Sequence, residues 1–236
     1  MMLTALSNVA RSLLHLAYPS LCEGCAAPLL PGEALLCTSC QMALSRLDYH
    51  DDPDNETTAR LAGRVAFMHA TSFTGFTEGA LIQHLIHLLK YRQREDIGTG
   101  LGRLFGEELK DAAPWIKDVE AIVPVPLHPR KARDRGYNQS ALLGEGLSIA
   151  LGIPHHPHAL RRTRHTESQT RKSRADRAEN VADLFEATNA KAIAGKHVLL
   201  VDDVLTTGAT LEHAANALLK VPGVRVSIAT LAIAVR

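Results

Sequence analysis

An apolar run that ends in two adjacent acids constrains the fold of this chain more than any other sequence feature. Residues 198–210 read Val-Leu-Leu-Val-Asp-Asp-Val-Leu-Thr-Thr-Gly-Ala-Thr. Consecutive apolar residues indicate a strand buried on both faces, which is typical of a parallel sheet covered by helices. A helical pattern follows over residues 210–220. The sequence therefore predicts an α/β fold with Asp202 and Asp203 at the carboxyl end of a strand, where open sheets bind ligands.

The residues after the two acids suit a phosphate group. Free N–H groups at a helix N-terminus bind anions, and threonine hydroxyls add further hydrogen-bond donors. The two carboxylates can accept hydrogen bonds from sugar hydroxyls or hold a hydrated Mg²⁺. A capped helix alone would explain the loop but not the acids beside it. We therefore expect a sugar phosphate to bind here, with its phosphate on Thr206, Thr207, Gly208, Ala209 and Thr210.

Other phosphate-binding classes fit this sequence less well. The chain lacks the GxxxxGK[ST] pattern of P-loop NTPases. The glycines at 98, 100, 102 and 106 miss the dinucleotide-binding GxGxxG pattern by one residue, and we expect them to lie in a loop. A phospho-receiver domain needs a further downstream aspartate, and none follows Asp203.

Four cysteines lie close together as two CxxC pairs, namely Cys22, Cys25, Cys37 and Cys40. Each CxxC turn places two sulfurs on one side of a metal ion, and two turns complete the tetrahedron that Zn²⁺ prefers. Four thiolates leave no open position for water, so the predicted zinc is structural. Two disulfides or a redox pair are the alternatives. A reducing compartment and the lack of a βαβ pattern around the pairs argue against both.

Composition changes along the chain and predicts how it divides. Residues 1–47 are expected to form an N-terminal helix and a zinc ribbon, and residues 48–60 an acidic linker. From residue 61 to 236, short strand patterns alternate with helical ones, as in an α/β domain. The expected elements are a strand pair over 64–76, strands at 121–126, 196–203 and 224–235, and helices at 79–92, 101–109, 139–150 and 210–220.

Charge and hydropathy limit the partners that the chain can have. The 26 Lys and Arg residues nearly balance the 25 Asp and Glu residues, but bases gather between residues 128 and 177. Arg130 and Arg135 follow a proline-ended strand in a predicted basic loop, so they can reach the same sheet end as Asp202. No apolar run approaches the ~20 residues that cross a bilayer. We therefore expect no membrane insertion and a cytoplasmic location.

Taken together, these motifs resemble a known family. The string at residues 198–210 is similar to the phosphoribosyl-pyrophosphate (PRPP) signature of type I phosphoribosyltransferases. The chain also contains the double CxxC and the string Pro124-Val-Pro-Leu-His128 followed by Arg135-Gly-Tyr-Asn-Gln139. With these features it resembles the competence-associated ComF family, which includes GntX-like proteins. Lys90 and Tyr91 belong to the same pattern, and Lys90 either faces the ligand or complements its helix dipole.

The resemblance implies a type I phosphoribosyltransferase-like parallel sheet with flanking helices and a small hood, preceded by a small zinc ribbon. The hood, expected near residues 64–76, would choose the acceptor. Asp202 and Asp203 would be the catalytic residues and contact the ribose, while residues 206–210 would bind the 5′-phosphate of PRPP. Mg²⁺ and positive charge would assist the departure of pyrophosphate. The candidates for contact with pyrophosphate are Val125, Arg130, Arg135, Arg161, Arg171 and Arg174.

Two functions remain open at this point. The first is a PRPP-binding, Mg-dependent phosphoribosyltransferase-type protein that acts in natural competence and DNA uptake. The alternative is a non-catalytic accessory protein that binds single-stranded DNA or a helicase-like partner, with PRPP as a regulatory ligand. The basic stretch 161–177 could be a solvated surface, a loop that closes over pyrophosphate, or a nucleic-acid contact.

Overall fold

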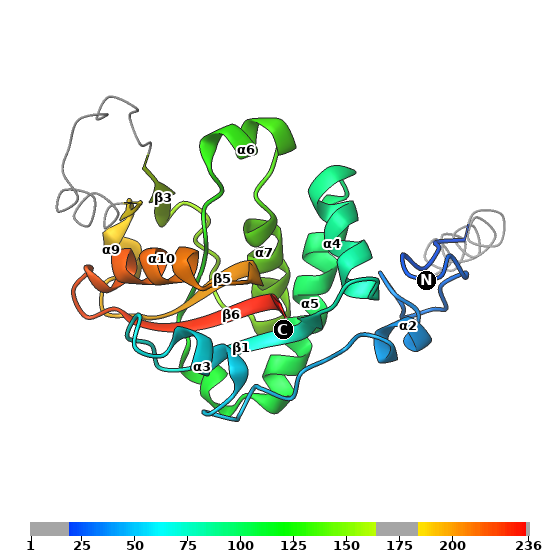
Figure 1. The fold of residues 1–236 in the computed structure, drawn as a ribbon, viewed down its shortest axis with the longest axis horizontal. Helices are drawn as coiled ribbons and strands as arrows, with labels where there is room; N and C mark the ends of the chain where they lie inside the picture. The colour runs from blue at the N-terminus through cyan, green and yellow to red at the C-terminus, as the bar shows by residue number, and fades with distance from the viewer. Residues whose placement is uncertain (1–18, 164–183, 235–236) are drawn as a thin grey trace, which may run out of the picture.

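The fold is built around a parallel sheet. The computed structural model describes residues 19–163 and 184–234, without the side chains of residues 129–131. The expected N-terminal helix therefore lies outside the described residues. The four strands are β1 (Ala70–Phe76), β2 (Ala121–Pro124), β5 (His197–Leu205) and β6 (Arg225–Ala234). They pair in the order β1-β6-β5-β2, all parallel, which confirms the predicted fold class (Figure 1).

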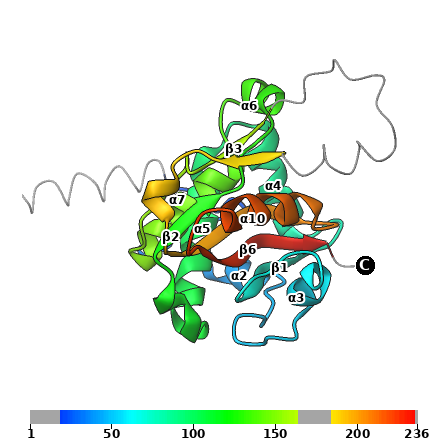
Figure 2. The ribbon, with the colours of Figure 1, turned by 90° about the vertical axis from the view of Figure 1, so that its left-hand side faces the viewer.

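Helices cover both faces of this sheet because β5 is apolar on both sides. Leu199 and Val201 of β5 face one apolar cluster, while Val198 and Leu200 face the other. The first face packs against α4 (Leu81–Tyr91), α5 (Glu95–Ala112) and α7 (Gln139–Leu151), and the second against α10 (Ala209–Leu219) (Figures 1 and 2). None of the described helices is long and apolar enough to cross a bilayer.

Small elements complete the described part of the chain. A two-stranded antiparallel sheet of β3 and β4 lies on the α10 side. Short helical segments lie between the larger elements. These elements are α2 (Thr38–Met42), α3 (Glu56–Leu61), η1 (Pro114–Asp118), α6 (Pro129–Arg135), β3 (Leu160–Arg162), β4 (Phe185–Ala187) and α9 (Ala190–Ile193). The predicted basic loop after β2 thus contains a helix, α6.

The glycines at 98, 100, 102 and 106 lie inside α5, so the prediction of a loop is wrong. Helix α5 crosses α7 so closely that a side chain would collide with backbone atoms. A Cβ atom on Gly102 would lie 2.3 Å from the carbonyl oxygen of Leu143, and one on Gly146 would lie 2.2 Å from that of Thr99. The glycines therefore permit close helix packing and do not bind a phosphate.

Residues 64–76 contain one strand, β1, which begins at residue 70, so the prediction of a strand pair is wrong. Strand β1 pairs in parallel with β6, and Gly75 lies within this pairing opposite Ile233. Phe73, in the middle of β1, is completely buried. Residues 70–76 therefore belong to the core and do not form a separate hood.

Part of residues 48–60, expected to be a linker, packs against β1. The side chain of Asn55 caps α3 by accepting a hydrogen bond from the Thr58 N–H, and it donates another to the Ala70 carbonyl at 2.8 Å. Thr57 is fully buried, and its hydroxyl lies 2.7 Å from that of Ser72 on β1. The chain therefore enters the α/β fold before residue 61, while the proposed domain boundaries stay a prediction.

His155 makes the stability of this fold depend on pH. Its ring lies against Gly144 of α7, and its Nε2 is buried without a hydrogen-bond partner among the described residues. Burial, and then the neighbouring His156 and His158, lower the pKa of His155 from 6.5 to about 4. Between these values the unfolded chain binds more protons than the folded one, so stability falls as pH decreases.

We expect the melting temperature to drop between about pH 7 and about pH 4, and His155→Gln to reduce that drop. The exposed His84 of α4, changed to Gln, is the control and should leave the pH dependence unchanged. Thermal unfolding followed by circular dichroism measures both variants. An equal drop in wild type and His155→Gln would contradict the assignment.

Candidate functional site

The two acids, Asp202 and Asp203, form an acid pair near the carboxyl end of β5, where three elements meet. Asp202 is 9% exposed, and its Oδ1 accepts hydrogen bonds from the Ser140 hydroxyl of α7 at 2.8 Å and the Asp203 N–H at 2.9 Å. Asp203 is half-buried, and its Oδ2 lies 2.7 Å from Nζ of Lys90, at the end of α4. Both carboxylates are thus held in place from helices on one face of the sheet.

The acid pair has an unfavourable charge balance. Burial, and then the negative charge of Asp203, raise the pKa of Asp202 to about 7, although Ser140 and Lys90 act in the opposite direction. Lys90 supplies one positive charge to two carboxylates. The pair is therefore suited to hydroxyl donors or to a hydrated Mg²⁺, which proteins hold through one or two carboxylates.

Residues 206–210, the threonine loop, follow the acid pair directly and lead into α10. Thr206, Thr207 and Thr210 are exposed, so their hydroxyls are accessible. Gly208 has a φ of 84° as the N-cap of α10, and a Cβ there would also lie 3.0 Å from Leu61. Glycine is therefore required for the loop to adopt this shape. The exposed end of α10 is the kind of site that binds anions.

Arg60, in α3, stabilises the threonine loop through hydrogen bonds to backbone carbonyl groups. Its Nη1 donates to the carbonyl oxygens of Thr206 at 3.2 Å and of Ala234 at 2.8 Å. Its other terminal nitrogen pairs with Glu56 on the same helix. Arg60 ties the loop to the end of β6. Sequence reasoning missed both Arg60 and Ser140, because each acts through a contact far away along the chain.

The structure separates the candidates for contact with pyrophosphate. The Val125 N–H donates to the Val201 carbonyl at 2.8 Å, so Val125 continues the pairing of β2 with β5. Arg135 faces the site, with its guanidinium 5.6 Å from the ring centroid of Tyr91. Arg161 forms an ion pair with Glu186 at 2.7 Å on the small sheet. Arg171, Arg174 and the side chain of Arg130 lie outside the described residues.

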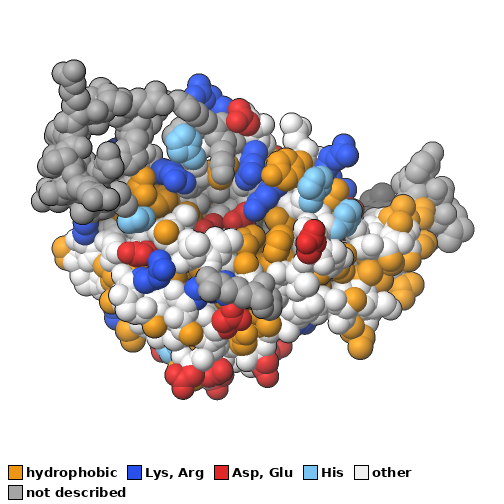
Figure 3. All heavy atoms as spheres, viewed as in Figure 1, with side chains coloured by type: hydrophobic (Ala, Val, Ile, Leu, Met, Phe, Trp, Pro, Cys, Tyr) orange, Lys and Arg blue, Asp and Glu red, His pale blue; other side chains and the backbone are white. Residues whose placement is uncertain are grey.

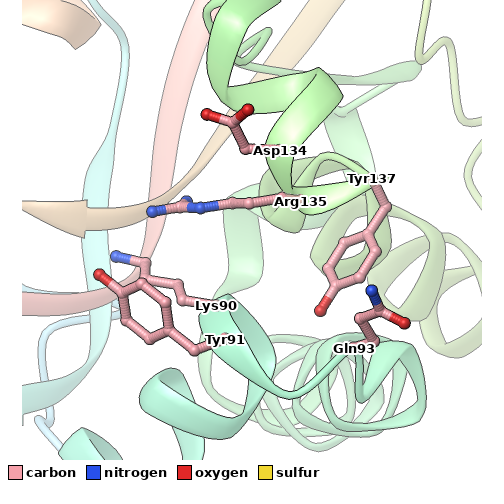
Figure 4. Close-up of a pocket in the computed structure, with 6 residues that line it drawn as sticks. All are labelled: Lys90, Tyr91, Gln93, Asp134, Arg135 and Tyr137. Carbon is pink, nitrogen blue, oxygen red and sulfur yellow. The ribbon is translucent and has the colours of Figure 1, made fainter.

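A pocket of about 310 Å³, the Lys90 pocket, lies between the end of α4 and the end of α6 (Figure 4). It is lined by Lys90, Tyr91, Gln93, Asp134, Arg135 and Tyr137.

In the space-filling view, acidic side chains lie in a hollow near the middle of the face, and Lys and Arg side chains surround it (Figure 3). The site therefore combines an acidic floor with a basic rim.

The four cysteines form one cluster, the cysteine cluster, as expected for a shared ion. Their sulfur atoms all lie within 4.8 Å of one another, and none forms a disulfide. The sulfurs of Cys25 and Cys37 are 3.7 Å apart, close to the edge of about 3.8 Å expected for tetrahedral sulfurs at ~2.3 Å from zinc. The donor set and its geometry thus fit Zn²⁺.

Backbone amides also prepare this cluster for a cation. The N–H groups of Gly24 and Cys37 point to Sγ of Cys22, at 3.4 and 3.2 Å. Burial raises the pKa of Cys22, but backbone hydrogen bonds from Cys37, Cys25 and Gly24 outweigh it and lower the pKa to about 6. A thiol that ionises this readily is a good metal ligand.

Comparison with known proteins agrees with this site. Residues 140–234 match the family described as phosphoribosyl transferase domain, a range that begins at Ser140 and includes the acid pair and the threonine loop. The chain is 37% identical to Competence protein F of Haemophilus influenzae over 139 residues, which are 58% of this chain and 61% of that protein. It is 37% identical to DNA utilization protein YhgH of Escherichia coli K12 over 138 residues, which are 58% of this chain and 60% of that protein. A longer match, over 211 residues and 81% of both chains, has 28% identity to Competence protein ComFC of Bacillus subtilis.

Two solved structures match parts of the chain. Glutamine PRPP amidotransferase from Bacillus subtilis has a TM-score of 0.42 at 21% identity, over 60% of this chain and 30% of that one. Adenine phosphoribosyltransferase from Leishmania tarentolae has a TM-score of 0.36 at 13% identity. This match covers 77% of the present chain and 89% of the other one.

Residues 140–234, which contain the acid pair and the threonine loop, are thus similar to phosphoribosyl transferase domains. The chain as a whole is similar to Competence protein F, to YhgH and to ComFC. The chain spans about 60% of the length of Competence protein F and of YhgH.

Proposed function

We propose that this chain binds PRPP together with Mg²⁺ at the acid pair and transfers the phosphoribosyl group to an acceptor, in a cytoplasmic process linked to DNA uptake. The main support is the direct succession of two carboxylates, a hydroxyl-rich loop and a helix N-terminus at the carboxyl end of β5. The names of the relatives, which refer to competence and to DNA utilization, support the biological context.

Each part of the site has a role in this proposal. Asp202 and Asp203 accept hydrogen bonds from the ribose hydroxyls, while the threonine loop donates to the 5′-phosphate. Ser140 and Lys90 keep the two carboxylates in position. Mg²⁺ supplies charge that stabilises the departing pyrophosphate. Arg135, on the rim of the site, is the described arginine that is best placed to add positive charge there.

Isothermal titration of PRPP in the presence of Mg²⁺ tests the proposal. Wild type should bind, whereas Asp202→Asn with Asp203→Asn should weaken binding by about 100-fold or more, because two charge-assisted contacts are lost. The matched control is Asp51→Asn with Asp52→Asn, an exposed acid pair outside the site. Unchanged affinity in the Asp202 and Asp203 variant would rule out this site.

The cysteine cluster holds a structural Zn²⁺ in the same proposal. Four thiolates complete the coordination of zinc and leave no position for a substrate, so the ion acts in folding. The spacing of the sulfurs and the amides that face Cys22 support this role.

The names of the relatives also favour a second candidate, a non-catalytic protein that binds single-stranded DNA or a helicase-like partner, with PRPP as a regulatory ligand. Most of the basic stretch that would contact DNA lies outside the described residues. This candidate predicts DNA affinity that falls steeply with salt and that weakens when Arg171, Lys172 and Arg174 are neutralised. It also predicts no release of pyrophosphate. Release of pyrophosphate with any acceptor would favour the enzyme.

A further inference from the structure

Buried polar contacts fix helix α3 on the central sheet. Asn55, the N-cap of α3, is buried and donates to the Ala70 carbonyl of β1 at 2.8 Å. The Thr57 hydroxyl lies 2.7 Å from that of Ser72 on β1, which lies 2.7 Å from that of Thr230 on β6. The three hydroxyl-bearing residues are fully buried. Because buried polar groups are costly to separate from their partners, α3 is held in one position beside β1 (Figure 2).

The last turn of α3 lies against the threonine loop. A Cβ atom on Gly208 would be 3.0 Å from Leu61 and 3.7 Å from the carbonyl oxygen of Arg60. The side chain of Arg60 is 13% exposed, and its Nη1 donates to the Thr206 carbonyl at 3.2 Å. Its other terminal nitrogen forms an ion pair within α3. Both terminal nitrogens thus have protein partners, so Arg60 acts on a ligand through the loop.

The contact with Arg60 fixes the direction of one backbone N–H group in the threonine loop. The peptide bond between Thr206 and Thr207 is trans and planar, so its C=O and N–H groups point in opposite directions. Since the Thr206 carbonyl accepts from Arg60, the Thr207 N–H points away from Arg60. Both threonines are exposed, so a phosphate at the start of α10 can approach this N–H group.

We infer that Arg60 is a positioning residue for the 5′-phosphate, and that it acts by aiming the Thr207 N–H at a phosphate oxygen. The inference rests on the proposed function. A loop whose donors are already oriented loses little conformational freedom when the phosphate binds, so preorganisation raises affinity. The guanidinium also keeps a positive charge next to the loop, which favours an anion there.

The test uses the full-length protein and three variants. Arg60→Met retains the aliphatic part of the side chain and removes the donors, whereas Arg60→Lys retains the charge. Arg225→Met is the control, because Arg225 is exposed at the start of β6 and Arg60 contacts the other end of that strand at Ala234. Titration calorimetry measures the affinity for PRPP with Mg²⁺ and for ribose 5-phosphate. Proton–nitrogen NMR follows the backbone amide signals of Thr207 and Asp203, and circular dichroism checks the fold.

We expect Arg60→Met to bind PRPP about tenfold more weakly than wild type, because one donor to the phosphate is no longer held in place. Affinity for ribose 5-phosphate should fall by the same factor, since both ligands carry the same phosphate. Arg60→Lys should lie between Arg60→Met and wild type, and Arg225→Met should match wild type. Saturating PRPP should shift the Thr207 amide proton downfield in wild type and less in Arg60→Met. The shift of the Asp203 amide should be the same in both proteins.

Two results would overturn the inference while leaving the proposed function in place. The first is equal PRPP affinity in wild type and Arg60→Met. The second is an equal shift of the Thr207 signal at saturation in these two proteins, which would assign any loss of affinity to a general effect on the fold. Arg60→Lys provides both comparisons if Arg60→Met does not fold. Failure of wild type to bind PRPP would instead overturn the proposed function.

Discussion

Gly102→Ala is expected to destabilise the protein by about 3 kcal/mol or more, although alanine is normally the better helix former. The added methyl group would lie 2.3 Å from the carbonyl oxygen of Leu143 and 3.0 Å from Cα of Gly146. Both are backbone atoms of α7, so no side chain can rotate away. Helices α5 and α7 would have to separate, which opens the apolar cluster around them.

The matched control is Gly100→Ala, two residues away in the same helix. A Cβ on Gly100 would meet the side chain of Leu35 at 3.0 to 3.4 Å, and the end of that side chain can shift. We expect a small change in stability for this variant. Urea unfolding of both variants measures the difference in the free energy of unfolding. Equal stability of Gly102→Ala and Gly100→Ala would contradict the close helix packing.

Removal of zinc is the second large effect that we expect. The wild-type protein, purified under reducing conditions, should contain about one zinc ion per chain, and a strong chelator should lower its melting temperature by 10 °C or more. Zinc sites of this type contribute about 10 kcal/mol or more to folding. Leu36, next to Cys37, is completely buried in the same apolar cluster as Phe73 of the central sheet. Loss of the ion therefore exposes part of the main core.

Cys25→Ser should reproduce the effect of the chelator, and Ser39→Ala is its control. Ser39 is exposed and lies inside the second CxxC turn without contributing a sulfur. Metal analysis and thermal unfolding measure both variants. A wild-type protein that contains no zinc, or whose melting temperature does not respond to the chelator, would refute the structural role.

The parts of the site that are continuous in sequence could be predicted from the sequence. The strand, the acid pair, the threonine loop and α10 follow one another directly, and each has a local pattern. The cysteine cluster could also be predicted from the sequence, because its two CxxC turns lie close together in the chain and supply all four sulfurs. What the sequence could not supply were contacts between distant segments. No local pattern marks Ser140 or Arg60, because their roles depend on hydrogen bonds to Asp202 and Thr206, which are far away in the chain.

The errors have the same origin. The glycines of α5 suggested a loop because the sequence does not show that α7 packs against them. Gly102 is needed because the backbone at Leu143 of α7 leaves no room for a side chain there. The glycine at 75 suggested a turn, whereas it continues a strand that is buried in the sheet beside β6. The residues expected to be a linker carry the polar side chains of Asn55 and Thr57, but these side chains find buried partners on β1.

Helix α4 spans the distance between the protein's two candidate sites. Leu81, in its first turn, lies 3.1 Å from the position of a Cβ on Gly24, between the first two cysteines, and Lys90, in its last turn, reaches Asp203. An eleven-residue helix is a stiff rod of about 16 Å. A displacement of the first CxxC turn would therefore be transmitted along α4 and would alter the contact between Lys90 and Asp203.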